Sequence, residues 1–254
     1  MKTGYRQSFI DILENFINGM QFQCQIWNVQ NNTPVTGQYT LSVDNVYHAV
    51  AGYTVTIGGK PYTIVSWIDT PNAQRLVVSD PGGSGVIAPQ QTFNFYTPYF
   101  FHGTPLDATT EIKQEKSEFN KSPMIWLWEN YEETYHDDPE DAIERDVEAS
   151  LYFLTITANS MKLQTDDLDY NYVRPMRRLL DNFIHSINNP IGILQRWDTK
   201  YKTQVYYKFG VIARNKGVSE NLMVDKLTGV ELKMTFKIIR SEYDNCEMYI
   251  TAID

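Results

Sequence analysis

The spacing of hydrophobic positions divides the chain into an N-terminal helix, a strand-rich segment and a mixed C-terminal segment. Residues 4–20 place apolar side chains three and four positions apart, which predicts an amphipathic helix. The pattern leaves open whether this helix packs on its own domain or docks as an arm on a neighbouring subunit. The apolar stripe consists of Phe9, Ile12, Leu13, Phe16, Ile17 and Met20.

Residues 21–101 predict a small all-β domain. Apolar and polar positions alternate over short runs, and Thr92–Phe101 is interpreted as the last, aromatic strand. After Tyr53–Ile57, the pair Gly58-Gly59 predicts a tight two-residue hairpin turn, because glycine tolerates the positive φ angles of such turns. Five or six short strands separated by Gly and Pro turns are typical of a small SH3-like or OB-like barrel.

A polar stretch, residues 105–122, is interpreted as a linker that leads to a second domain over residues 123–254. The second domain begins with a dense apolar strand. Asp138 before Pro139 predicts the start of a short helix, because these residues suit the cap and the first helical position. Alternation over Val147–Ile156 predicts the next strand.

The rest of the second domain predicts one long helix and three strands. The helix covers Asn171–Asn188, and the strands cover Val205–Ala213, Val230–Ile238 and Met248–Ala252. A short helix is predicted between the first two strands, over Ser219–Leu227. Each strand has one apolar and one polar face, which favours an antiparallel sheet with helices on one face.

The predicted fold class is therefore α+β, with an N-terminal helix and a small barrel followed by an antiparallel sheet and its helices. The predicted division is residues 1–20 for the helix, 21–104 for the barrel, 105–122 for the linker and 123–254 for the α+β domain. A chain of 254 residues suits two domains of roughly 100–150 residues each.

Composition narrows the compartment and the class of protein. The two cysteines, Cys24 and Cys246, are too few for a secreted disulfide scaffold, so a reducing compartment is expected. The sequence has no apolar run typical of a signal peptide or a membrane span, so we expect neither. Seventeen tyrosines, twelve phenylalanines and five tryptophans suit sheet faces and large interfaces.

Charge is segregated along the chain, although the net charge is only −9. Residues 1–104 hold four basic and five acidic side chains, residues 105–173 hold five and seventeen, and residues 174–240 hold thirteen and five. Either the acidic and basic segments lie side by side within one subunit, or an acidic face of one copy meets a basic face of the next.

The acidic run raises the question of metal or carboxylate chemistry. Residues 129–148 contain ten acidic side chains, and His136, Asp137 and Glu140 could supply metal ligands. No EF-hand or HExxH spacing is present, and Gly58-Gly59-Lys60 lacks the context of a phosphate loop. Two carboxylates would suffice for a glycoside hydrolase, but any acidic protein offers such pairs. We therefore expect no catalytic residue, no cofactor and no metal.

The order of elements resembles the head–tail connector proteins of tailed bacteriophages, and more narrowly a tail ring protein of the crAss-like phages of Bacteroidetes. In the second domain, the helix with Val173-Arg174-Pro175-Met176 and the strand Leu227–Leu232 are similar to a tail-terminator-type fold. The other segments that carry the resemblance are Gly52–Gly59, Pro123–Leu127 and Leu151–Phe153.

The resemblance implies a structural virion protein, made in the host cytoplasm, that forms a six-fold or twelve-fold ring of its own copies. Such rings contact the portal and other tail proteins, and DNA passes through their lumen without specific binding. An acidic lumen suits this passage, because like charge keeps DNA from adhering. The resemblance implies no membrane partner and no catalytic residue.

Two sets of residues follow as candidates for the lumen or for contacts between subunits. The acidic candidates are Glu132, Glu133, Asp137, Asp138, Glu140 and Asp141. The basic candidates are Arg174, Arg177, Arg178, Lys200, Lys202, Arg214 and Lys216. The alternatives are a receptor-binding or carbohydrate-binding virion module, which would gather exposed aromatics in loops, and a carboxylate-dependent glycoside hydrolase.

Overall fold

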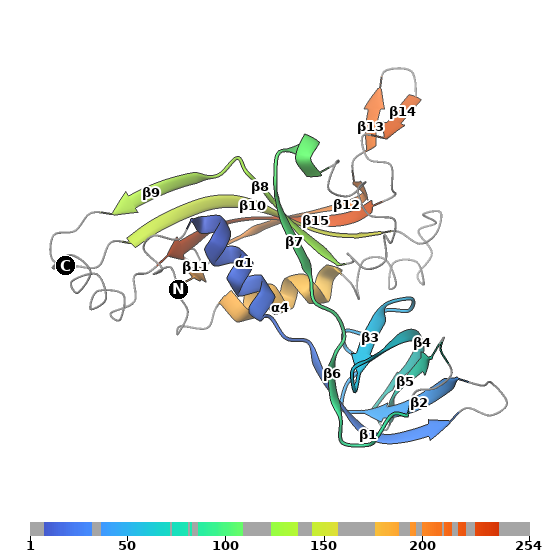
Figure 1. The fold of residues 1–254 in the computed structure, drawn as a ribbon. Coiled ribbons are helices and arrows are strands. Elements are labelled where there is room, and N and C mark those ends of the chain that lie inside the picture. The colour runs from blue at the N-terminus through green and yellow to red at the C-terminus, as the bar shows by residue number, and fades with distance from the viewer. Residues whose placement is uncertain are drawn as a thin grey trace, which may run out of the picture.

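The chain forms two β-sheets and a separate hairpin in the computed structural model (Figure 1). The structure describes residues 8–31, 37–71, 73–80, 82, 86–108, 123–136, 144–156, 176–187, 194–196, 200–209, 211–214, 218–221 and 227–238. Strands dominate these residues, and two helices pack against one of the sheets, which confirms the α+β class in its broad outline. Within the same residues, no helix is long and apolar enough to cross a membrane.

The smaller sheet has six strands in the order β3-β4-β5-β2-β1-β6 and curls into a nearly closed barrel, with β3 beside β6. Its strands are β1 (Gln23–Asn31), β2 (Gln38–Val43), β3 (Thr54–Ile57), β4 (Lys60–Thr70), β5 (Ala73–Ser79) and β6 (Thr92–Asn94). Gly58 and Gly59 join β3 to β4 with φ angles of 58° and 81°, so the predicted hairpin is confirmed.

The N-terminal helix packs on the larger sheet of its own chain. Helix α1 (Phe9–Gly19) begins after Ser8, whose side chain and that of Asp11 form a reciprocal capping box. The Phe9 ring lies 5.3 Å from that of Phe236, and the Phe16 ring lies 5.5 Å from that of Phe183. The predicted apolar stripe is therefore the buried face, and it is covered without a second subunit.

The larger sheet is built around two long strands, β10 and β15, which pair antiparallel over twelve residues. On the other side of β10 lie β9 and β8, with β7 beyond β8, and on the other side of β15 lie β11 and β12. All pairs are antiparallel except β7 with β8. The strands are β7 (Tyr99–Gly103), β8 (Met124–Trp128), β9 (Glu132–His136), β10 (Glu144–Ile156), β11 (Leu194–Arg196), β12 (Lys202–Phe209) and β15 (Leu227–Ile238).

Helices α1 and α4 (Arg178–Ile187) cover one face of the larger sheet (Figure 1). Alternate residues of β10, including Val147, Leu151 and Phe153, point into that layer and are fully buried. The opposite face, called the outer face below, carries Glu148, Ser150 and Tyr152. The predicted helices on one face of the sheet are confirmed for the described residues, but the prediction of a purely antiparallel sheet is wrong, because β7 pairs parallel to β8.

The barrel lies in the sequence between helix α1 and strand β7. Both belong to the larger sheet and its helices, called the larger unit below. The strand predicted over Thr92–Phe101 is wrong as a single strand, because β6 joins the barrel whereas β7 joins the larger sheet. The backbone N–H of Phe95 donates to the carbonyl of Phe22 at 3.0 Å, so the chain enters and leaves the barrel at one place. Alternation along a strand does not reveal which sheet the strand joins, so the sequence pattern missed this division.

The short helix predicted over Ser219–Leu227 is also wrong where the structure describes it. Residues 218–221 form β14 (Val218–Asn221), which pairs with β13 (Val211–Arg214) in the separate hairpin. The β-branched residues Val211 and Ile212 favour a strand that pairs with residues 218–221, over the helix cap predicted at Ser219. The helix predicted at Asp138 and the strand predicted at Met248–Ala252 lie outside the described residues.

Candidate functional site

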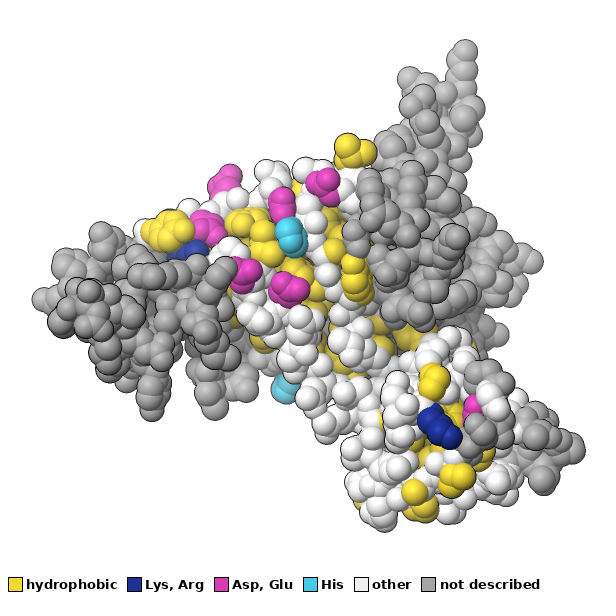
Figure 2. Space-filling model, in the orientation of Figure 1, with side chains coloured by type: hydrophobic (Ala, Val, Ile, Leu, Met, Phe, Trp, Pro, Cys, Tyr) yellow, Lys and Arg dark blue, Asp and Glu magenta, His cyan; other side chains and the backbone are white. Residues whose placement is uncertain are grey.

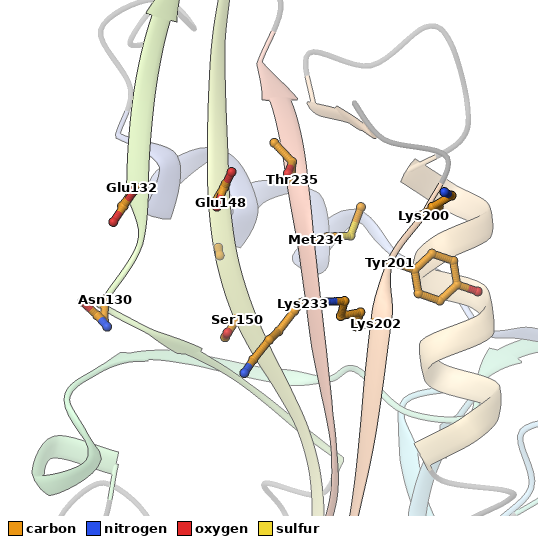
Figure 3. A pocket seen from close by; sticks show the side chains of 11 residues that line it. Asn130, Glu132, Glu148, Ser150, Lys200, Tyr201, Lys202, Lys233, Met234 and Thr235 are labelled. Carbon is orange, nitrogen blue, oxygen red and sulfur yellow. The ribbon is translucent and has the colours of Figure 1, made fainter.

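The outer face of the larger sheet has an apolar end and a polar end. At the apolar end, Trp126 stacks on Tyr152 with ring centroids 4.8 Å apart, and Phe209 packs against both rings. At the polar end lies a hollow of about 500 Å³ that crosses β9, β10, β15 and β12 (Figure 3). The side chains that line the hollow include Glu132, Glu148, Ser150, Lys202, Lys233 and Thr235.

Strand register places like charges opposite each other in this hollow. Glu132 of β9 is the direct partner of Glu148 of β10. Lys202 of β12 is the direct partner of Lys233 of β15. Directly opposed like charges destabilise a pair of strands, because their side chains are about 5 Å apart. The hollow therefore has a doubly acidic corner and a doubly basic corner on one surface, as Figure 3 shows.

A buried carboxylate connects the two ends of the outer face. Glu231 of β15 is 2% exposed and lies opposite Tyr152 in the strand register. It accepts hydrogen bonds from the hydroxyls of Tyr152 at 2.8 Å and Tyr206 at 2.9 Å. The ammonium of Lys233 lies 3.1 Å from the same carboxylate. A one-residue slip of β15 would bury this charge without its donors, so the network favours a single register.

The hydrogen bonds to Glu231 also determine its protonation. Burial alone would raise the pKa of Glu231, but the hydrogen bonds from the two tyrosines and Lys233 outweigh burial and lower it. Burial, followed by the hydrogen bond to Glu231, raises the pKa of Tyr206 to about 12 and that of Tyr152 well above its ordinary value. The network is therefore an ionised carboxylate held by two neutral phenols across the neutral pH range.

The predicted acidic residues do not all lie on one surface. Adjacent positions of β9 face opposite sides, so Glu132 lines the hollow while Glu133 points to the helix-covered side. There, Glu133 lies 3.4 Å from the Arg145 guanidinium and accepts a hydrogen bond from Tyr135 at 2.6 Å. The other four acidic candidates, Asp137, Asp138, Glu140 and Asp141, lie outside the described residues.

The predicted basic residues separate into three places. Lys200 and Lys202 line the hollow, and Arg177 pairs with Asp181 one turn away at 3.3 Å. Arg178 contacts the barrel instead. The remaining candidates are not placed as side chains, since Arg214 is described as backbone of β13 and Arg174 and Lys216 lie outside the described residues.

Arg178 belongs to a joint between the barrel and the larger unit. Its guanidinium lies 4.0 Å from the Tyr47 ring centroid and donates a hydrogen bond to the Tyr47 carbonyl. Nearby, the hydroxyls of Tyr53 and Thr155 lie 3.0 Å apart in a buried hydrogen bond. Both contacts join the barrel to the second unit, and the hydrophobic core is continuous between the two.

The acidic and basic segments of the sequence lie side by side within one subunit. β10 comes from the acidic segment and β15 from the basic one, and the two strands pair from Arg145 to Ile156. Figure 2 shows Asp and Glu side chains gathered on the visible face of the larger unit, whereas the visible face of the barrel carries little charge. The contact between an acidic face of one copy and a basic face of the next stays a prediction.

A metal site is not formed by the residues that the structure describes. Those residues contain no group of three or more His, Cys, Asp or Glu side chains that could hold a metal ion. Of the three ligands considered from the sequence, His136 lies in β9, while Asp137 and Glu140 fall outside the described part of the chain.

Sequence reasoning missed the Glu231 network and the Lys233 corner of the hollow. Glu231 occupies a polar position of a regularly alternating strand, so its pattern indicated solvent exposure. Only the pairing of β15 with β10 and β12 places Tyr152 opposite Glu231 and brings Tyr206, which is opposite Gly229, within reach of its carboxylate. Comparison with known proteins found no matching family model, no similar curated protein and no similar solved structure.

Proposed function

We propose that the chain is a structural virion protein that forms a homo-oligomeric ring in the head–tail connector or tail of a tailed bacteriophage. In this proposal the ring lines the channel through which DNA is ejected, and the larger unit is a tail-terminator-like domain. The element order supports the proposal, because a helix, a small barrel and a helix-covered sheet follow one another as the resemblance requires.

The observation that carries the proposal is the β13–β14 hairpin. It forms a sheet of its own and stands away from both larger sheets in Figure 1. An isolated two-stranded hairpin is at best marginally stable in water. A hairpin held away from its own core is a feature that suits a contact with another subunit, in which the neighbour supplies the missing packing.

The alternative of a carbohydrate-binding or receptor-binding module has less support. It requires exposed aromatic side chains gathered in loops. Among the described residues, the exposed aromatics are Trp27 in β1, Tyr47 after β2, Tyr135 in β9 and Tyr201 before β12. These four come from separate elements, and the Tyr47 ring is covered by Arg178.

Electron microscopy and sedimentation velocity of the purified full-length chain test the proposal. We expect rings of six or twelve copies, formed by the chain alone or on addition of the phage portal protein. Deletion of residues 211–221, with the ends joined by a short Gly-Ser link, should reduce ring formation. A matched change at the tip of the β4–β5 hairpin, Pro71→Gly, should leave it unchanged. A stable monomer in all these conditions, with affinity for a glycan, would contradict the proposal.

A further inference from the structure

The hollow on the outer face has an acidic corner and a basic corner, whose charges are complementary. Glu132 faces Glu148, and Lys202 faces Lys233. Lys233 is balanced by the buried Glu231. In the part of the chain that the structure describes, Glu132, Glu148 and Lys202 make no ion pair. The excess charge at each corner is therefore available to a partner of the opposite sign.

The two corners are arranged so that the surface is complementary to itself. The acidic corner lies on β9 and β10, and the basic corner lies diagonally across on β15 and β12. Ser150 and Thr235 lie between the corners, on the two central strands. If a second copy is turned over by a two-fold rotation about an axis between the corners, its acidic corner meets the first copy's basic corner. The reverse contact forms at the same time, as an isologous interface requires.

We infer that the hollow is a self-recognition surface through which two copies of the chain meet face to face in a two-fold dimer. In each dimer, the acidic corner of one copy faces the excess positive charge of Lys202 in the other copy, and this contact occurs twice. The inference goes beyond the proposed ring, since a cyclic ring alone does not bring the same face of two copies together. It assigns the subunits a paired state outside the ring.

The size and chemistry of the hollow determine how strong this contact is. Eleven residues line it, whereas a stable interface takes roughly 20–30 residues on each side. The contact is also mainly ionic and exposed at its rim. We therefore expect a weak dimer that dissociates when salt is raised, because the Debye length falls from about 10 Å at 0.1 M to about 3 Å at 1 M.

Charge reversal at one position in each corner tests the inference. Glu132 and Lys202 are both exposed and lie on outer strands, so E132K and K202E leave the buried core intact. Each variant alone places like charges across the two-fold contact and should be monomeric at low salt. An equimolar mixture places each introduced charge opposite its complement and should dimerise, as should the double variant E132K/K202E.

The measurement is sedimentation velocity of the full-length chain at 50 mM and 500 mM salt, with thermal melting as a check on folding. Controls are E14K in α1 and K60E in β4, which reverse exposed charges outside the hollow and should dimerise like the wild type. A wild-type chain that stays monomeric at low salt overturns the inference, as do single variants that dimerise normally or a mixture that fails to dimerise. Rings that form equally from the wild type and both single variants would leave the proposed function standing while this inference fails.

Discussion

The guanidinium of Arg178 lies 4.0 Å from the centroid of the Tyr47 ring, although the two residues are 131 positions apart in the chain. The contact joins the start of α4 to the loop after β2, and it therefore couples the larger unit to the barrel. The same guanidinium donates a hydrogen bond to the Tyr47 carbonyl, so ring and backbone are held together.

Arg178→Ala should loosen this joint. A cation–π contact with a hydrogen bond is worth about 1–3 kcal/mol, and we expect the free energy of unfolding to fall by that amount in urea titrations. Limited proteolysis should also cut between the barrel and the larger unit sooner. The control is Arg177→Ala, which removes an exposed pair with Asp181 and should change stability by less than about 1 kcal/mol. Equal effects from the two substitutions would contradict the joint.

Acid should weaken the barrel side of the same joint through His48. Burial, followed by repulsion from Arg178, lowers the pKa of His48 from 6.5 to about 4. The Nδ1 atom lies 2.9 Å from the Tyr96 hydroxyl. Between pH 6.5 and 4 the unfolded chain binds a proton that the folded chain does not, so stability should decrease as pH falls across this window. His48→Gln should flatten that part of the pH profile in thermal melts, and an unchanged slope would contradict the assignment.

Glu231 should produce a second loss of stability at lower pH. Its folded pKa lies below the ordinary glutamate pKa of 4.5, so its contribution to stability is complete above pH 4.5 and is lost as pH falls through the folded pKa. Glu231→Gln removes the charge that both tyrosines and Lys233 hydrogen-bond, and we expect a loss of about 1–3 kcal/mol at pH 7. The variant should also be less sensitive to acid below pH 4.5.

The same hydrogen-bond network should also lose stability at alkaline pH, through Tyr206. Because the pKa of Tyr206 is raised to about 12, its contribution is complete below the ordinary tyrosine pKa of 10 and is lost as pH rises through 12. Tyr206→Phe should remove this alkaline loss and keep the aromatic packing. The difference in ultraviolet absorbance between the wild type and Tyr206→Phe measures the titration of Tyr206. A titration near pH 10 would contradict the network.

Gly229→Ala should destabilise the larger sheet at its centre. A Cβ at this position would lie 2.5 Å from a methyl carbon of Leu154 and 3.2 Å from the carbonyl oxygen of Phe153. Leu154 is fully buried, so it cannot move aside into solvent, and overpacking of this kind costs about 1–3 kcal/mol. Gly19→Ala is the matched control, because nothing lies within 4 Å of its added Cβ. Chemical denaturation of both variants measures the difference.

Local patterns predicted the elements that depend on local spacing. The stripe of α1, the Gly58-Gly59 turn and the two central strands all follow from positions within a few residues of each other. What the pattern could not supply was pairing at a distance. The sequence pattern could not separate β7 from β6, because apolar and polar residues alternate in both strands. The two strands differ only in the sheet that each one joins.

The candidate site was predictable only in part, for the same reason. Glu132 and Lys202 could be selected from the segregation of charge along the chain. Their like-charged partners, Glu148 and Lys233, become apparent only from the strand register. The burial of Glu231 was harder still to predict, because the tyrosines that hydrogen-bond its carboxylate come from two other strands.

The position of the barrel between α1 and β7 has a consequence for the order of folding during synthesis. Every strand of the barrel has been made by residue 94, and its pairs are confined to that part of the chain. Helix α1 precedes the barrel in the chain, yet the ring of Phe9 packs against Phe236, near the end of β15. Domains that emerge first generally fold first. The barrel can therefore fold before β15 has been made, whereas the apolar stripe of α1 stays uncovered until β15 emerges from the ribosome.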